Sequence, residues 1–173
     1  MGPAGGWLAA HRDRAAAVAN LVQRWGRTLD AGGDVWVKEG GQSDVTAAVV
    51  AEIERSRPRL DGRRRIHVVQ HSDWNEGQTT PAALHFTRTH TDYIRIRDAN
   101  AYLRLPGGDS AFAAAARAHP AFGSFWRAAF AYYDPGTMID FSDTGELMHL
   151  LGLGEIDING FRQRFLEPRA QAR

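Results

Sequence analysis

The stretch Ile66-His-Val-Val-Gln70, which runs directly into His71-Ser-Asp-Trp-Asn-Glu76, decides the fold. It is a short apolar run that ends in a polar cluster, and a helix is expected to start there. Strands that alternate with helices in this way predict a parallel sheet with crossover helices. Ligands bind such sheets outside the carboxyl ends of the strands. The same pattern occurs where Asp34-Val-Trp-Val-Lys38 leads into Glu39-Gly-Gly-Gln-Ser-Asp44, and where Tyr93-Ile-Arg-Ile96 leads into Arg97-Asp-Ala-Asn100.

These repeats predict one α/β domain over residues 1–173, with three layers and a small, mostly parallel sheet flanked by helices. Residues 35–37 are apolar on both faces, which is typical of a central strand. The alternating pattern of residues 93–97 predicts either an edge strand or a strand with one polar-lined face. Such a small sheet has exposed edges, so we expect a homo-oligomer or a partner chain to cover them.

Apolar residues at helical spacing predict the other elements. The first long helix is expected over residues 7–29, and Thr80-Pro81 is typical of a helix start. Beyond Gly108 the chain is expected to be wholly helical in its C-terminal third. The aromatic stripe there predicts core packing rather than a cofactor site; it comprises Phe122, Phe125, Trp126, Phe130 and Tyr133.

Composition excludes several classes of function. The chain has no cysteine, which rules out disulfides, thiolate zinc sites and cysteine nucleophiles. A net charge of +1 gives no reason to expect a nucleic-acid partner, and the basic run Arg63-Arg64-Arg65 is typical of a solvated turn. No apolar run approaches the roughly 20 residues that span a bilayer. The N-terminus resembles no secretion signal, so a cytoplasmic protein without a membrane partner is expected.

The polar clusters that follow the strands hold the candidate site. Carboxylates beside amides suit either a hard cation or a sugar. The alternative is that such residues simply form turns and helix caps. That alternative explains single members well, whereas the density of the cluster after residue 70 favours a site. The candidates are Glu39, Asp44, His71, Asp73, Asn75, Glu76, Asp98 and Asn100.

Several catalytic motifs do not occur in the sequence. There is no Gly-x-Gly-x-x-Gly fingerprint after the first strand, no phosphate-binding Lys loop and no His-Glu-x-x-His. A Gly-x-Ser-x-Gly elbow is missing too, which disfavours a serine hydrolase. Later in the chain, Asp143 precedes Glu146 by three residues, which is typical of a helix cap or of a metal ligand at a helix start.

Three segments resemble the C-terminal part of nucleoside-hydrolase-like proteins, and the resemblance covers about residues 33–166. It implies hydrolysis or binding of an N-glycosidic ligand, a nucleoside or a sugar. It also implies a Ca²⁺ ion held by the carbonyl of Glu39 and the side chain of Asp143. The segments are Val35-Trp-Val-Lys-Glu-Gly-Gly-Gln-Ser-Asp44, His71-Ser-Asp-Trp-Asn75 and Asp140-Phe-Ser-Asp143-Thr-Gly-Glu-Leu. The residues expected to contact the ligand are His71, Asp73, Trp74, Asn75, Glu76 and Asn100.

The Asp-rich motif of that family, which carries most of its metal ligands, does not occur here. The resemblance therefore implies either a separately encoded partner chain or a degenerate homologue. A second hypothesis is a non-catalytic binding or assembly module that pairs through its exposed sheet edges. A third is an unrelated small enzyme that uses His71 and Asp73 as an acid–base pair.

Overall fold

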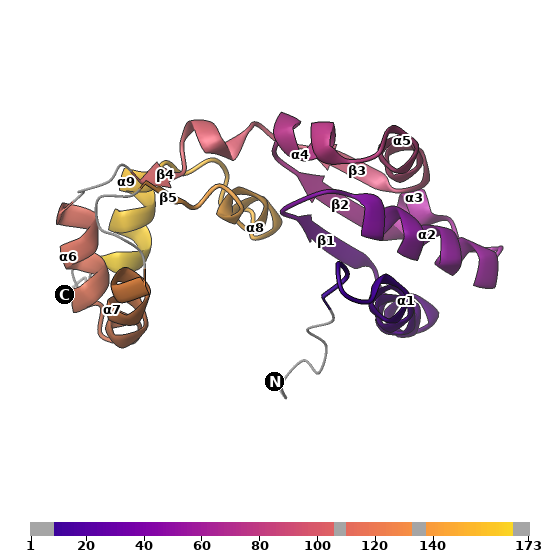
Figure 1. The fold of residues 1–173 in the computed structure, drawn as a ribbon, viewed down its shortest axis with the longest axis horizontal. Coiled ribbons are helices and arrows are strands. Elements are labelled where there is room, and N and C mark those ends of the chain that lie inside the picture. Colours follow the sequence, from indigo (N-terminus) through magenta and orange to yellow (C-terminus); the bar gives the residue numbers. More distant parts are fainter. Residues whose placement is uncertain (1–8, 106–109, 133–137, 168–173) are drawn as a thin grey trace. The chain divides into compact units, whose positions relative to one another are not determined.

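The computed structural model describes residues 9–105, 110–132 and 138–167 (Figure 1). The chain divides into two compact units, Met1–Arg97 and Asp98–Arg173. The first unit consists of α1 (Arg14–Asp30), β1 (Val35–Glu39), α2 (Asp44–Ser56), α3 (Gly62–Arg65), β2 (Ile66–Gln70), α4 (Asp73–Gln78), α5 (Pro81–His90) and β3 (Asp92–Arg95). The second consists of the 3₁₀ turn η1 (Ala99–Ala101), β4 (Arg104–Leu105), α6 (Ser110–Ala118), α7 (Gly123–Tyr132), β5 (Ile139–Asp140), α8 (Thr144–Leu150), α9 (Ile158–Phe161) and the π-helical turn η2 (Arg162–Leu166).

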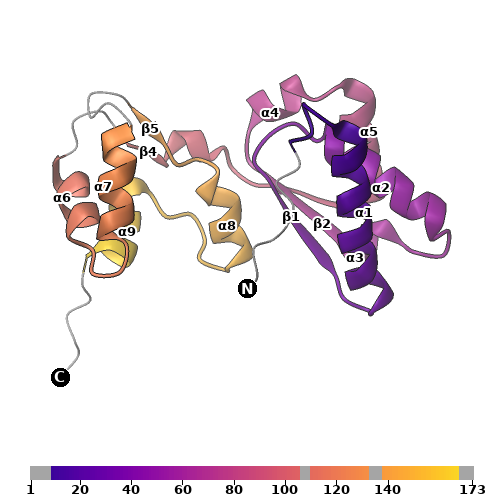
Figure 2. The same cartoon turned by 60° about the horizontal axis from the view of Figure 1, so that its bottom comes forward.

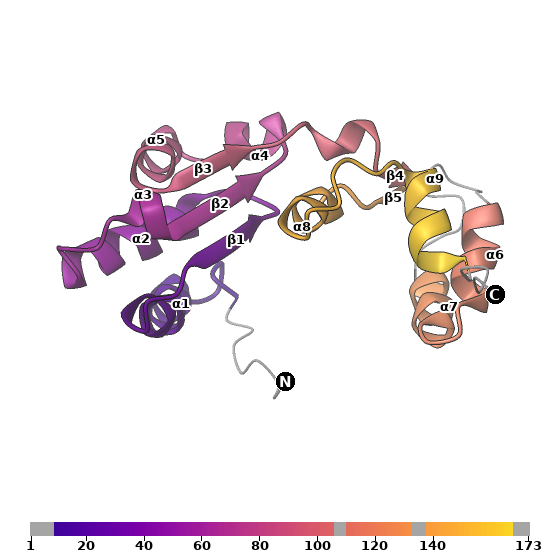
Figure 3. The same ribbon diagram turned by 180° about the vertical axis from the view of Figure 1, so that it is seen from behind.

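The predicted α/β class, a small parallel sheet flanked by helices, is confirmed. Its strands lie in the order β1-β2-β3, and both pairs are parallel. Figure 3 shows the three arrows side by side and pointing the same way. The single-domain hypothesis stays a prediction. In the described part of the chain, no helix has the length and apolar character needed to cross a membrane.

The core of the first unit lies between the sheet and its long helices. Val49 and Ile53 of α2 pack with Ile66 and Val68 of β2, and all four side chains are fully buried. Leu29 of α1 joins them. Burying a side chain of this size stabilises the fold by about 1.5–3 kcal/mol. Figure 2 shows α1 and α2 lying alongside the strands that they cover. This core holds the strand ends in a fixed register.

The prediction that residues 35–37 form a central strand is wrong, because β2 is the middle strand. Trp36 of β1 is 53% exposed, and its ring stacks on His67 of β2 with 4.0 Å between ring centroids. The apolar character of this strand therefore serves cross-strand stacking on one face rather than burial on both. The edge position predicted for the third strand is confirmed.

Helix starts follow the capping residues. The first long helix begins at Arg14 rather than near residue 7, because the Asp13 side chain accepts a hydrogen bond from the Ala16 N–H at 2.9 Å. Residues 7 and 8 lie outside the described residues. The start expected at Thr80-Pro81 is confirmed by α5, which has Pro at its first position.

The second unit is mostly helical, but it is not wholly helical beyond Gly108 as predicted. Residues 139–140 form β5, which pairs antiparallel with β4. The N–H of Phe141 then donates to the carbonyl of Leu103 at 2.9 Å and extends the ladder. A two-residue strand is too short to show the alternation that identifies strands in a sequence.

The aromatic stripe of α7 is only partly core. Phe130 is buried and Trp126 packs against the same cluster, which includes Phe112 and Leu166. Phe122 and Phe125 are 60% and 66% exposed, so the core prediction is wrong for these two side chains. Residue 133, also part of the predicted stripe, lies outside the described residues. The stripe is wider than the core that it covers.

Candidate functional site

The carboxyl ends of the three parallel strands lie in one row in the first unit. In the register of the sheet, Glu39 pairs with Gln70, and Gln70 pairs with Arg95. We call this row, together with the loops 40–43 and 71–72 that follow β1 and β2, the carboxyl edge. It is the edge at which open α/β sheets bind their ligands.

Gln70 joins the two loops of the carboxyl edge. Its side chain is fully buried, and its Nε2 donates to the carbonyl of Gly41 at 2.9 Å. Its Oε1 accepts from the N–H of His71 at 2.9 Å and from Asn75 Nδ2 at 3.3 Å. Gln70 was not among the residues singled out from the sequence. The available signal was a polar residue directly after the apolar pair Val68 and Val69, at the end of the strand.

Glu39 is the strongest candidate for proton chemistry at this edge. Only 8% of the residue is exposed, and its Oε2 accepts a hydrogen bond from the Thr46 hydroxyl at 2.6 Å. Burial raises the pKa of the Glu39 carboxyl to about 7, against the opposing effect of the Thr46 hydrogen bond. Near neutral pH, this carboxyl is therefore divided between its protonated and ionised forms. The sequence placed Glu39 among the candidate carboxylates, whereas the family resemblance gave a role only to its backbone carbonyl.

Other polar residues of the loops hold the helices in place. Asp44 accepts from the backbone N–H and the hydroxyl of Thr80, at 3.2 Å and 2.6 Å. The Ser43 N–H donates to Thr79 Oγ1 at 3.1 Å, and that hydroxyl donates to the Asn75 carbonyl at 2.8 Å. Ser72 caps α4. These bonds fix α2, α4 and α5 around the carboxyl edge.

Glu76 is the centre of a charged cluster beside β3. Its Oε1 accepts from the Tyr93 hydroxyl at 2.7 Å and pairs with Arg88 at 2.9 Å. Its Oε2 lies 3.5 Å from Arg95 Nε. Burial, followed by the hydrogen bond to Glu76, raises the pKa of Tyr93 well above its usual value. Both carboxylate oxygens of this predicted ligand contact are thus engaged within the protein.

The other predicted residues of the first unit differ in exposure. Asp73 forms an ion pair with Arg95 at 2.5 Å, yet its side chain is 90% exposed. Trp74 is 67% exposed on the first turn of α4. His71 follows β2 directly, and Asn75 is buried at the Gln70 amide. The fold therefore brings all five predicted residues between 71 and 76 to the carboxyl edge or beside it.

Three predicted residues, Asp98, Asn100 and Asp143, belong to the second unit, so their convergence with the carboxyl edge stays a prediction. Asn100 lies in η1, where its Nδ2 donates to Asp98 Oδ1 at 2.8 Å and its Oδ1 accepts from Arg104 Nη2 at 2.8 Å. Asp143 stands immediately before α8, at the N-cap position that the sequence indicated.

No family model, curated protein or solved structure matches this chain. The resemblance to nucleoside-hydrolase-like proteins therefore stays a prediction.

The carboxylates of the first unit do not suit a calcium ion by themselves. Calcium takes six to eight oxygen ligands, with charged carboxylates among them. Burial raises the pKa of the Glu39 carboxyl to about 7, which disfavours its charged form, and both oxygens of Asp44 accept hydrogen bonds from Thr80. Of the two expected ligands, the first unit holds the Glu39 carbonyl and the second holds Asp143. We therefore derive no chemical step through calcium, and its binding stays a prediction.

Proposed function

We propose that the carboxyl edge of the first unit binds a nucleoside or a related sugar and that Glu39 is the acid in hydrolysis of its N-glycosidic bond. The observation that carries this proposal is a buried carboxyl with a pKa of about 7 at the end of a parallel strand. Catalytic acids are tuned by burial toward the operating pH in this way.

The chemistry needs a proton at the departing base. Cleavage of the bond leaves its electron pair on a ring nitrogen, and a protonated Glu39 neutralises that charge as it develops. Water then adds to the oxocarbenium-like sugar and loses a proton. The rate should fall about tenfold for each pH unit above 7, because the acid form of Glu39 is depleted.

Trp74 supplies an exposed ring next to the carboxyl edge. Aromatic side chains stack on bases and on the apolar faces of sugars. A side chain added at Gly41 would meet no atom within 4 Å, so the loop after Glu39 leaves open space. Both features support a ligand beside Glu39.

The test is release of free ribose from adenosine, inosine and uridine by the full chain. Glu39→Gln should lower the rate about 10²–10⁴-fold, which is the usual contribution of a general acid. Gly41→Leu should weaken binding, whereas Gly77→Ala, which also faces open space, should not. No release with any nucleoside, or an unchanged rate for Glu39→Gln, would contradict the proposal.

Two exposed tryptophans provide a matched pair of variants. Trp74→Ala should weaken nucleoside binding about tenfold, because stacking contributes about 1–3 kcal/mol per base. Trp36→Ala should leave binding unchanged. Trp36 lies three residues before the end of β1 and therefore away from the carboxyl edge, where the ligand is proposed to bind. Equal losses in the two variants would show that neither ring is a specific ligand contact.

The exposed Trp36 on β1 favours a second candidate function, assembly through the sheet edge. On this hypothesis the chain forms a dimer through β1, and sedimentation velocity should show it. Trp36→Ala should dissociate the dimer, and Trp74→Ala should not. A monomer at every protein concentration would remove this candidate.

Calcium has a direct test that needs no enzymatic activity. If the residues expected from the resemblance hold the ion, millimolar CaCl₂ should raise the melting temperature by mass action. Asp143→Asn should abolish that rise. An unchanged melting temperature would argue against calcium while leaving the role of Glu39 intact.

A further inference from the structure

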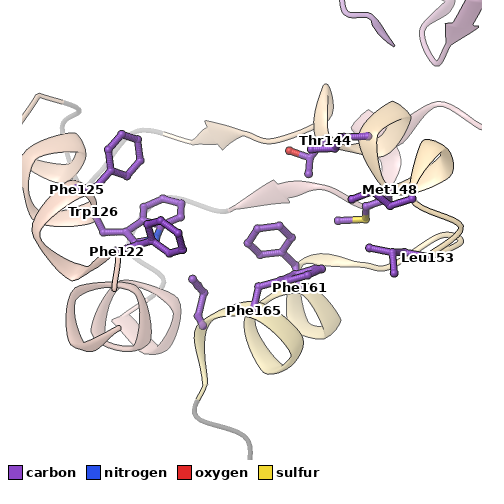
Figure 4. Close-up of a pocket in the computed structure, with 11 residues that line it drawn as sticks. Phe122, Phe125, Trp126, Thr144, Met148, Leu153, Phe161 and Phe165 are labelled. Atoms are coloured by element: carbon purple, nitrogen blue, oxygen red, sulfur yellow. The ribbon is translucent and has the colours of Figure 1, made fainter. Parts of the chain in front are cut away.

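The second unit has an apolar hollow that the proposed function does not use. It has a volume of about 360 Å³. Figure 4 shows the side chains around it, among them Phe125, Met148 and Phe161. It is lined by Phe122, Phe125, Trp126, Thr144, Leu147, Met148, Leu151, Leu153, Phe161, Phe165 and Leu166. Ten of these side chains are apolar, so the hollow suits the apolar part of a ligand.

The hollow has a buried floor and an exposed rim. Met148 and Leu166 are 2% and 4% exposed, and both belong to core clusters of the unit. Phe125 and Leu151 at the rim are 66% and 62% exposed. Because its floor is part of the core, the hollow reaches below the surface of the unit. The volume of the hollow is in the range of small-molecule sites, roughly 300–1,000 Å³.

The size of the hollow favours a small ligand over a protein partner. A stable protein interface uses about 20–30 residues on each side. The hollow is lined by eleven residues, and the most buried of them lie at its floor rather than on a flat face. An apolar chain that enters the hollow reaches Met148, whereas a flat partner surface would not.

A cation lies next to Phe165, one of the lining residues. The Arg164 guanidinium lies over the ring of Phe165, 5.9 Å from its centroid, and Phe165 lines the hollow. A guanidinium binds a carboxylate through charge-assisted hydrogen bonds. The hydroxyl of Thr144 and the indole N–H of Trp126 are the polar side-chain groups in the lining. A ligand with one apolar chain and one carboxylate therefore complements both the hollow and its rim.

We propose that this hollow binds a single-chain carboxylic acid of medium length, with its chain against Phe161 and Met148 and its carboxylate at Arg164. The binding free energy comes from apolar surface removed from water, and the ion pair fixes the orientation. This proposal does not depend on the proposed function, because every residue that it uses lies in the second unit.

The test is calorimetric titration of the full chain with decanoate, kept well below its micelle concentration. One saturable site per chain is expected. The double variant Phe125→Ser, Leu151→Ser should weaken binding about tenfold, because both side chains lose apolar contact with the ligand. Tyr132→Ser is the matched control: Tyr132 is an exposed aromatic residue of α7, 86% exposed, and does not line the hollow.

A charge-reversal variant tests the orientation. Arg164→Glu should weaken decanoate about threefold and leave decanol unchanged, because exposed ion pairs contribute less than about 1 kcal/mol. Decanoate that fails to saturate, or that is weakened as much by Tyr132→Ser as by the double variant, would overturn the proposal. A dimer that the double variant abolishes, without any saturable decanoate binding, would assign the hollow to a second copy of the chain instead.

Discussion

Glu39 and Glu76 lie near the same edge of one sheet, yet they have different partners. Glu39 accepts a hydrogen bond from the neutral hydroxyl of Thr46, at 2.6 Å. Glu76 pairs with the Arg88 guanidinium at 2.9 Å and accepts from the Tyr93 hydroxyl at 2.7 Å. A guanidinium offsets the charge of a carboxylate that has left water, whereas a hydroxyl does so only in part.

The difference separates a proton-exchanging group from a structural one. Burial raises the pKa of Glu39 to about 7, so its carboxyl can gain or lose a proton at neutral pH. The charge of Glu76 is used to hold α4, α5 and β3 together. The residue type is therefore not enough to assign a role, and the partners of each carboxyl decide it.

The largest expected effect is a change in the free energy of unfolding with pH, caused by the ionisation of Glu39. At low pH, its carboxyl is protonated in both the folded and the unfolded chain. As the pH rises from 4.5 to about 7, the unfolded chain ionises first while the folded chain keeps the proton. The free energy of unfolding should therefore fall by up to about 3 kcal/mol over this range.

Glu39→Gln should remove this slope, because glutamine does not titrate and still accepts from Thr46. Urea unfolding at pH 5 and pH 8 measures the effect. Glu52→Gln is the control, since this glutamate of α2 is paired with Arg55 and partly exposed. A slope that survives in Glu39→Gln would show that another group carries the pH dependence.

Glu76→Gln should destabilise the first unit by about 2 kcal/mol at pH 7. The variant keeps an acceptor for Tyr93 but leaves Arg88 without its anion and Arg95 with Asp73 alone. Hydrogen bonds to charged groups contribute about 1.5–3 kcal/mol. Asp73→Asn removes the exposed partner of Arg95 and should cost less than about 1 kcal/mol. Equal costs in the two variants, measured by urea unfolding, would contradict the central role given to Glu76.

Thr46→Val should have the smallest effect, about 1 kcal/mol. The Thr46 hydroxyl favours the ionised form of Glu39, so its removal should raise the pKa of Glu39 above 7. The stability loss should therefore be larger at pH 8 than at pH 5. An equal loss at the two pH values would show that the hydroxyl does not act through the charge of Glu39.

The three parallel strands could be predicted from the sequence because apolar runs bounded by polar clusters are a local signal. The strand over residues 66–70 has the predicted bounds, and the third strand begins one residue earlier than predicted. Their order could not be predicted, because Trp36 has the apolar character of a core residue but stacks on His67 at the surface. The pairing of residues 139–140 with residues 104–105 could not be predicted either. It joins segments that are far apart in the sequence, and neither segment is long enough to show a strand pattern.

Part of the candidate site could also be predicted. Polar residues after parallel strands must meet at one edge, so the position of the segment 71–76 at that edge could be predicted, while its role as a ligand site stays a prediction. Which of its side chains are engaged depends on residues far along the chain, such as Arg88 and Tyr93 for Glu76. The pKa of Glu39 depends on its burial, which a sequence pattern does not reveal.

The most direct test of this account is a pH titration of the side-chain carboxyl carbons by ¹³C NMR, in protein labelled at glutamate. The signal that disappears from the spectrum of the Glu39→Gln variant is assigned to the Glu39 carboxyl. This signal should titrate near pH 7, well above the ordinary glutamate value of about 4.3. A Glu39 carboxyl that ionises below pH 5 would contradict its role as an acid at neutral pH.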